Sequence, residues 1–149
     1  MKKKEKITQM KRIMILVGAV VLFGIVTETV YAQSLGKFYI AIQLDENGFA
    51  PSGAEDTVKD MHNRIARDRE LSLAEDEADA DFMITIVSRE ENIVSGQSNS
   101  RRLTSTLSVK DEGDWKPGTR ISKVSTFWNI SAIDTLNDAK RWIKANIKK

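Results

Sequence analysis

The sequence predicts an α+β fold: a two-layer sandwich in which two helices cover one face of an antiparallel sheet of about four strands, preceded by a signal peptide. Two observations predict the sandwich. Several segments repeat apolar residues with the two-residue period of a strand, and two others repeat them with the period of a helix. Each helical segment has an apolar stripe that must be buried, and one face of a sheet can bury both.

The first 32 residues are expected to direct export. Six basic residues and one acid precede a run of fourteen apolar or glycine residues at 13–26. As a helix this run would rise about 21 Å, less than the roughly 30 Å hydrocarbon core of a bilayer. This length fits a signal peptide, and Val30 and Ala32 match its cleavage pattern. The domain is then periplasmic or secreted. In the alternative, residues 13–26 stay in the membrane as an uncleaved anchor and the domain lies outside.

The predicted domain, residues 33–149, is small and slightly acidic. It has 17 basic and 19 acidic side chains, a net charge of −2, so it is a poor candidate for a nucleic-acid binder. Residues 45–91 contain 14 acidic and 5 basic side chains, whereas residues 120–149 contain 2 and 7. Such an asymmetry can orient a charged partner. Cysteine is absent, which excludes disulfides and cysteine-linked lipid.

The first predicted elements are a strand and a helix. Residues 37–44 are rich in aromatic and β-branched types, with Phe38, Ile40, Ile42 and Leu44 on one face. Residues 45–48 have turn chemistry. A helix is expected over residues 53–68, because Ser52 and Glu55 have the spacing of a capping box. Its apolar stripe consists of Val58, Met61 and Ile65.

The middle of the chain is predicted to be strand-rich. A short edge strand at 70–73 is followed by the acidic run 75–81. Residues 82–89 predict a strand with Phe82, Ile84 and Ile86 on one face and Met83 and Val87 on the other, so both sides are expected to be partly covered. Residues 101–110 alternate apolar and polar side chains, which predicts a second strand, and the polar residues 95–100 predict the loop between them. On the second strand the side chains expected to face outward are Arg102, Thr104, Thr106, Ser108 and Lys110.

The end of the chain is predicted to hold a hairpin loop, a strand and a helix. Residues 111–118 (DEGDWKPG) have turn chemistry and place Trp115 in the loop. A strand is expected at 120–128. The apolar residues that support it are Ile121, Val124, Phe127 and Trp128. Ser131 and Asp134 resemble a second cap, and the final helix follows. Its apolar residues are Ile133, Leu136, Ile143 and Ile147.

Two resemblances to known families accompany this pattern. From Ala54 onward, the order helix, three strands, helix resembles that of a double-stranded-RNA-binding domain. The final helix begins Ser131-Ala132-Ile133-Asp134, without the basic cluster of that family, so the resemblance implies no RNA binding. The stretch Asp79-Ala80-Asp81-Phe82-Met83-Ile84 is similar to the strand entry of exported envelope α/β domains, including the amino-terminal domain of TolB-type proteins. It covers only these few residues.

The candidate catalytic and metal-binding residues are few. The single histidine, His62, lies beside the first helix stripe without a nucleophile motif and is interpreted as a helix-flank residue partly covered by packing. Glu77, Asp79 and Asp81 alternate and could converge on calcium, which takes six to eight oxygen ligands. The run lacks the glycine and the distal glutamate of an EF-hand loop. No cofactor is therefore predicted, and a calcium-dependent binding module is an alternative.

The leading hypothesis is a non-catalytic exported domain that binds a protein or another partner in the cell envelope. Its contact surface is expected to be the uncovered sheet face with Arg102, Thr104 and Thr106, together with the loop that bears Trp115. A small carboxylate-dependent hydrolase is a further alternative. Glu90 and Glu91 cannot form its catalytic pair, because adjacent strand residues point to opposite faces.

Overall fold

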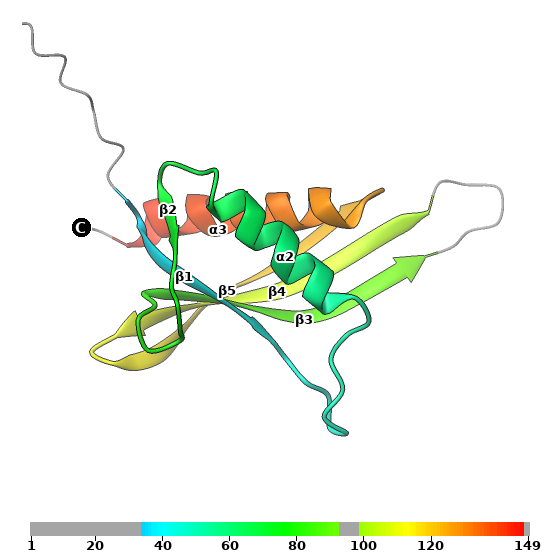
Figure 1. Ribbon diagram of the computed structural model, residues 1–149, viewed down its shortest axis with the longest axis horizontal. Coiled ribbons are helices and arrows are strands. Elements are labelled where there is room, and N and C mark those ends of the chain that lie inside the picture. The colour runs from blue at the N-terminus through cyan, green and yellow to red at the C-terminus, as the bar shows by residue number, and fades with distance from the viewer. Residues whose placement is uncertain (1–33, 93–98, 148–149) are drawn as a thin grey trace, which may run out of the picture. The chain divides into compact units, whose positions relative to one another are not determined.

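The computed structural model describes residues 34–92 and 99–147, which form a five-stranded mixed sheet with two helices on one face (Figure 1). The α+β prediction is therefore confirmed. The prediction of an antiparallel sheet of about four strands was wrong, because the strand order β2-β1-β3-β4-β5 contains two parallel pairs. The expected targeting segment and residues 95–98 of the expected loop lie outside the described residues. Within them, no helix is long and apolar enough to span a bilayer.

The amino-terminal half explains the parallel pairs. β1 (Gly36–Ile42) is followed by α2 (Ala54–Ile65) and by the short edge strand β2 (Leu71–Leu73). Because α2 carries the chain back to the start of β1, β2 runs in the same direction as β1. The strand prediction for residues 37–44 extended too far, since β1 ends at Ile42 and Leu44 is exposed in the following loop.

The loop at residues 74–81 carries the chain from β2 to the other side of β1. Leu73 at the end of β2 and Phe82 at the start of β3 (Phe82–Asn92) both pair with Phe38 of β1. The loop must therefore cross β1 at this level. It crosses on the face away from the helices, because Asp79 forms an ion pair with Lys37, the neighbour of the buried Phe38.

β3, β4 (Ser100–Asp111) and β5 (Asp114–Ser125) form an antiparallel meander. The connection between β4 and β5 is the two-residue turn Glu112-Gly113, in which both residues have positive φ, 50° and 92°. This geometry matches the right-handed twist of the flanking strands. The predicted eight-residue hairpin loop was therefore wrong, and Trp115 lies in β5, paired with Lys110 of β4.

Both predicted helix caps were wrong. α2 begins after Gly53, whose left-handed backbone forms the cap without any side-chain hydrogen bond from Ser52. α3 (Trp128–Asn146) begins three residues before the predicted cap at Ser131. Ser131 is instead buried in the first turn of α3, where its hydroxyl lies 2.8 Å from the hydroxyl of Ser125. The predicted strand at 120–128 was too long for the same reason.

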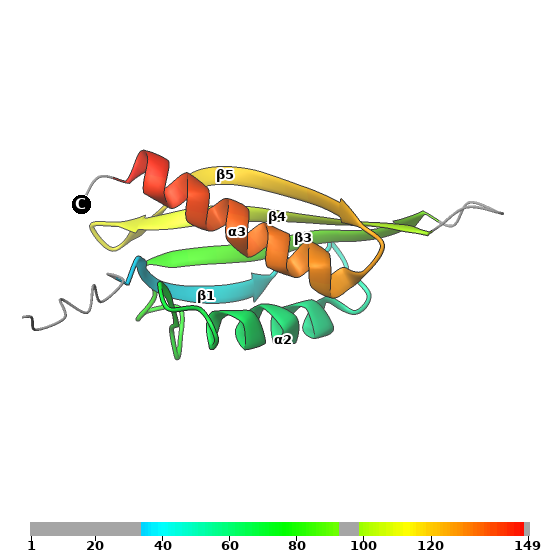
Figure 2. The ribbon, with the colours of Figure 1, turned by 90° about the horizontal axis from the view of Figure 1, so that it is seen from above.

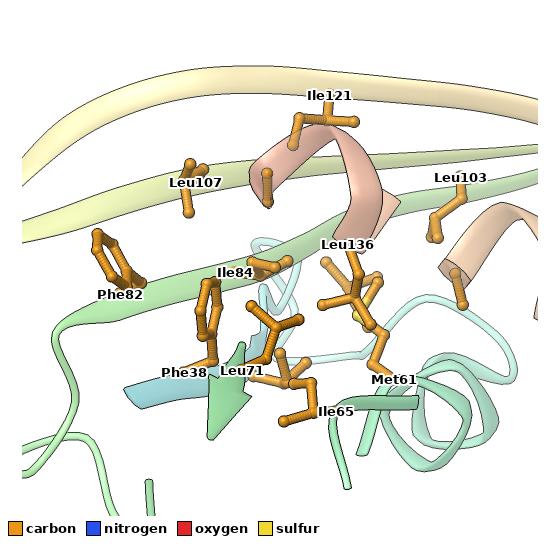
Figure 3. Packing of buried hydrophobic residues seen from close by; sticks show 14 of the residues in the cluster. Phe38, Met61, Ile65, Leu71, Phe82, Ile84, Leu103, Leu107, Ile121 and Leu136 are labelled. Carbon is orange, nitrogen blue, oxygen red and sulfur yellow. The ribbon is translucent and has the colours of Figure 1, made fainter. Parts of the chain in front are cut away.

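A single core lies between the helices and the sheet. In Figure 2, α2 runs along β1 while α3 crosses the sheet obliquely and packs on β4 and β5. Figure 3 shows side chains from both helices and from every strand of the sheet meeting in this layer. The residues that the sequence placed on inward faces and that are buried here include Phe38, Ile40, Met61, Ile65, Phe82, Ile84, Ile86, Leu103, Leu107, Ile121, Leu136 and Ile143.

Arg89 on β3 joins the starts of both helices. Its Nη1 donates a hydrogen bond of 2.6 Å to the carbonyl oxygen of Ser52, and its guanidinium lies 4.0 Å from the centre of the Trp128 ring. The guanidinium fills the space beside Gly53, where a β-carbon would lie 1.8 Å from Nη1. Gly53 is thus required by its φ of 68° and by this close approach.

Gly53→Ala is expected to lower the free energy of unfolding by about 2 kcal/mol, because it adds backbone strain and displaces Arg89 from Ser52 and Trp128. Gly48→Ala is the matched control. Gly48 also has a positive φ, 81°, but a β-carbon there meets no atom within 4 Å, so only strain of about 1 kcal/mol is expected. Urea titration measures both, and equal losses would contradict the proposed role of Arg89.

Candidate binding surface

The described residues leave most of the sheet face opposite the helices open. Alternation along each strand places one set of side chains there, between the buried residues of the core. The set is rich in hydroxyl groups and includes two arginines. Its members are Tyr39 and Ala41 on β1, Met83 and Thr85 on β3, Arg102, Thr104, Thr106 and Ser108 on β4, and Arg120, Ser122 and Val124 on β5.

One end of this open face is covered by the acidic loop at residues 74–81. Trp115 donates its indole N–H to Glu77 Oε1 at 2.8 Å, and Lys110 donates to the carbonyl oxygen of Ala78 at 2.6 Å. Lys110 also lies 5.3 Å from the Trp115 ring centre. On β1, the hydrogen bond to Asp79 raises the pKa of Lys37. These contacts hold the loop against the sheet.

The three carboxylates of the calcium hypothesis each face a different protein donor. Glu77 accepts the indole N–H of Trp115, Asp79 pairs with Lys37 at 2.5 Å, and Asp81 Oδ2 accepts the backbone N–H of Lys37 at 2.8 Å. Within residues 34–92 and 99–147, no group of three or more histidine, aspartate or glutamate side chains is arranged to hold a metal ion. The calcium-dependent module stays a prediction.

The sequence-predicted surface residues of β4 face outward as expected. Arg102 is exposed and lies 3.7 Å from Glu90 of β3. Thr104 lies in the middle of the sheet between Ser88 and Ser122 and is only 4 % exposed, so it offers little direct contact. Thr106 is partly exposed. Trp115 is partly buried, and its N–H is already occupied, so only part of the ring is available to a partner.

The remaining candidate side chains are apart from one another. Glu90 and Glu91 face opposite sides of β3, as predicted, and pair with Arg102 and Arg101 respectively. His62 is exposed on α2, so the prediction that packing partly covers it was wrong. The hydrolase alternative stays a prediction, with no carboxylate pair assigned to it.

Sequence reasoning missed three exposed apolar residues at the end of β5 and the start of α3. Val124, Phe127 and Ile130 are all exposed, and the prediction used Val124 and Phe127 only as support for a strand at 120–128. Counting in steps of two from the buried Ile121 gives Lys123 and Ser125 on the inner face and Val124 on the open face. That count was the available signal, whereas the prediction rested on the number of apolar residues in the segment and assigned them to no face.

Neither the protein-family models nor the curated protein sequences that were searched contain a match to this chain.

Proposed function

We propose that this protein is an exported, non-catalytic binding domain that uses its open sheet face to bind a protein partner in the cell envelope. The observation that supports the proposal is the placement of both described helices on one face of the sheet, which leaves the other face open beyond the loop at 74–81. Thr106 lies at the centre of that face, Arg102 lies near its end between Glu90 and Val124, and the partly exposed ring of Trp115 borders it.

The chemistry of the open face suits a polar, reversible contact. Hydroxyl groups of Thr85, Thr106 and Ser122 accept and donate hydrogen bonds without a charge that must be neutralised. Arg102 and Arg120 add guanidinium groups, which are enriched at protein interfaces and bind carboxylates through two hydrogen bonds. A partner with acidic and hydrogen-bonding groups on a flat surface would match this face.

The test is affinity capture from a bacterial envelope extract with the tagged chain as bait. Thr85 lies at the centre of the face, between Ala41 and Thr106, so Thr85→Trp is expected to obstruct a partner there and to abolish its capture. Lys59→Trp places the same ring on the exposed side of α2 and is expected to leave capture unchanged. Circular dichroism melts of both variants control for misfolding.

Two results would contradict the proposal. If folded wild-type and Thr85→Trp baits retain the same proteins, the open face is not the contact surface. If wild-type bait retains nothing above a bare-resin control, the domain does not bind a stable envelope partner under these conditions, and the binding function as proposed here is wrong.

A further inference from the structure

β5 is the long free edge of the sheet. Its 12 residues pair with β4 on one side, and no strand within residues 34–92 and 99–147 pairs with the other. The opposite edge strand, β2, has only three residues. Figure 2 shows β5 as the border of the sheet on the side away from α2. A free edge exposes backbone N–H and C=O groups that can pair with another chain, so proteins usually protect long edges.

The two halves of β5 differ in this protection. The first half contains Pro117, which has no N–H to donate, and the register shifts at Leu107/Ser108 around Gly118. A β-carbon at Gly118 would lie 3.4 Å from the Trp142 ring of α3, so the helix also crosses here. The second half, residues 119–125, pairs one to one with residues 101–107 and contains neither proline nor a bulge. This half is open to strand addition.

Exposed apolar side chains lie at the end of the open half and in the residues that follow it. The exposed fractions are 57 % for Val124, 57 % for Phe127 and 42 % for Ile130. Val124 is the last outward-facing residue of the strand, Phe127 caps α3 and Ile130 lies in its first turn. Val124 lies on the open face, opposite to α3, so it is the exposed apolar side chain that a strand added to this edge would cover.

The charge of this region selects the class of partner. Arg120 is exposed and forms no ion pair with any described residue, whereas Lys123, on the inner face, is bound to Asp138 of α3. Residues 119–125 contain no acidic side chain. A second copy of this chain paired through the same residues would therefore offer Arg120 no carboxylate. An acidic segment of another protein is complementary in charge.

We propose that residues 119–125 of β5 accept an extended segment of a partner protein as a sixth strand. Arg120 and Val124 share the open face and are four residues apart, so the segment places an acidic residue opposite Arg120 and an apolar residue opposite Val124. If the partner segment pairs antiparallel to β5, its sequence pattern from the amino to the carboxyl end is apolar-x-x-x-acidic. This site lies on the edge of the sheet and is separate from the proposed contact through the open face. If the contact through the open face were disproved, the proposal for the edge would be unaffected.

The probe is a phage-displayed library of random dodecapeptides, selected on the full chain immobilised through a carboxy-terminal tag. We expect enrichment of peptides with an acidic and an apolar residue four positions apart. For a synthetic copy of the most enriched peptide, Arg120→Glu and Val124→Glu are each expected to weaken binding about tenfold, measured by fluorescence polarisation. The control variants are Arg67→Glu, which changes an exposed arginine outside β5, and Leu44→Glu, which changes an exposed apolar residue outside β5. Each is expected to change the Kd less than twofold.

Residue-resolved amide hydrogen exchange locates the bound peptide. Slower exchange confined to residues 119–125 supports strand addition, and retained binding by Thr85→Trp separates the edge from the open face. Lack of enrichment for the pattern, equal weakening by the control variants, or protection of β3 and β4 without β5 would overturn the inference. A dimer seen in sedimentation experiments would also overturn the inference if Val124→Glu dissociated it. The strand paired with β5 would then come from a second copy of this chain.

Discussion

Leu136→Ala is expected to lower the free energy of unfolding by about 3–5 kcal/mol, the cost of a large-to-small change in a packed core. Leu136 is 1 % exposed on α3 and belongs to the same cluster as Met61 of α2 and Ile84 of β3. Figure 3 shows it between these two side chains. Its removal leaves a cavity where both helices meet the sheet. Since domains of this size are stable by only about 5–15 kcal/mol, one such change consumes much of the total.

Urea denaturation followed by tryptophan fluorescence measures the loss, because Trp128 and Trp142 pack against this core. Leu44→Ala removes the same atoms from an exposed loop position and is expected to cost less than about 0.5 kcal/mol. A similar small change for Leu136→Ala would show that α3 does not contribute to the folded core in solution. The m-value should stay unchanged if unfolding remains a single cooperative step.

The sequence predicted the core well because the core follows from periodicity. Ile84, Ile86 and Leu107 repeat at two-residue steps, and Met61 and Ile65 at a helical step, so each inward face could be assigned without knowing the partner. The sheet topology could not be assigned in this way. The choice between parallel and antiparallel pairing of β1 depends on where α2 returns the chain, which is a property of the connection rather than of any strand.

The candidate binding surface was predicted only in part, for physical reasons that concern single residues. The outward direction of Arg102 and Thr106 followed from alternation, but the burial of Thr104 depends on neighbours from β3 and β5. Trp115 was assigned to a loop because residues around it favour turns, yet Glu112-Gly113 alone makes the turn. The contact of its indole with Glu77 joins segments far apart in sequence, which no local pattern reveals.

An ion-pair network between the end of α2, the start of β2 and α3 is expected to make stability depend on pH. Lys140 contacts Asp68 at 2.9 Å and Glu70 at 2.6 Å, and Lys144 contacts Glu70 at 2.6 Å. The side chains of Asp68 and Lys140 are only 7 % and 18 % exposed. These two groups are therefore screened less by solvent than an ordinary surface pair.

The network shifts three pKa values. Burial acts to raise the pKa of Asp68, but hydrogen bonds from the Glu70 backbone N–H and from Lys140 lower it overall. Hydrogen bonds from Lys140 and then Lys144 lower the pKa of Glu70. Burial acts to lower the pKa of Lys140, yet its bonds to Glu70 and Asp68 raise it overall. Each shift favours the charged form of its group in the folded state.

Lys140→Met is expected to lower the free energy of unfolding at neutral pH by about 2–3 kcal/mol, because the aliphatic stem is kept while the Asp68 carboxylate remains nearly buried without its cation. The stabilisation from the lowered carboxyl pKa values is present above about pH 4 and is lost as the pH falls through the folded-state values. The stabilisation from the raised pKa of Lys140 is present below about pH 10 and is lost as the pH rises through that folded-state pKa. The difference in the free energy of unfolding between wild type and Lys140→Met should therefore be constant between these two pH limits and shrink in acid and in alkali.

Urea titrations of wild type, Lys140→Met and Lys144→Met from acid to alkaline pH measure this dependence. Lys144 has a half-exposed side chain and, among the described residues, pairs with Glu70 alone, so Lys144→Met is expected to have a much smaller effect at every pH. A Lys140→Met loss that persisted unchanged in acid would mean that the methionine disturbs packing. A loss that disappears once Asp68 is protonated would identify the unpaired carboxylate as its cause, because only the charged form needs the ammonium group.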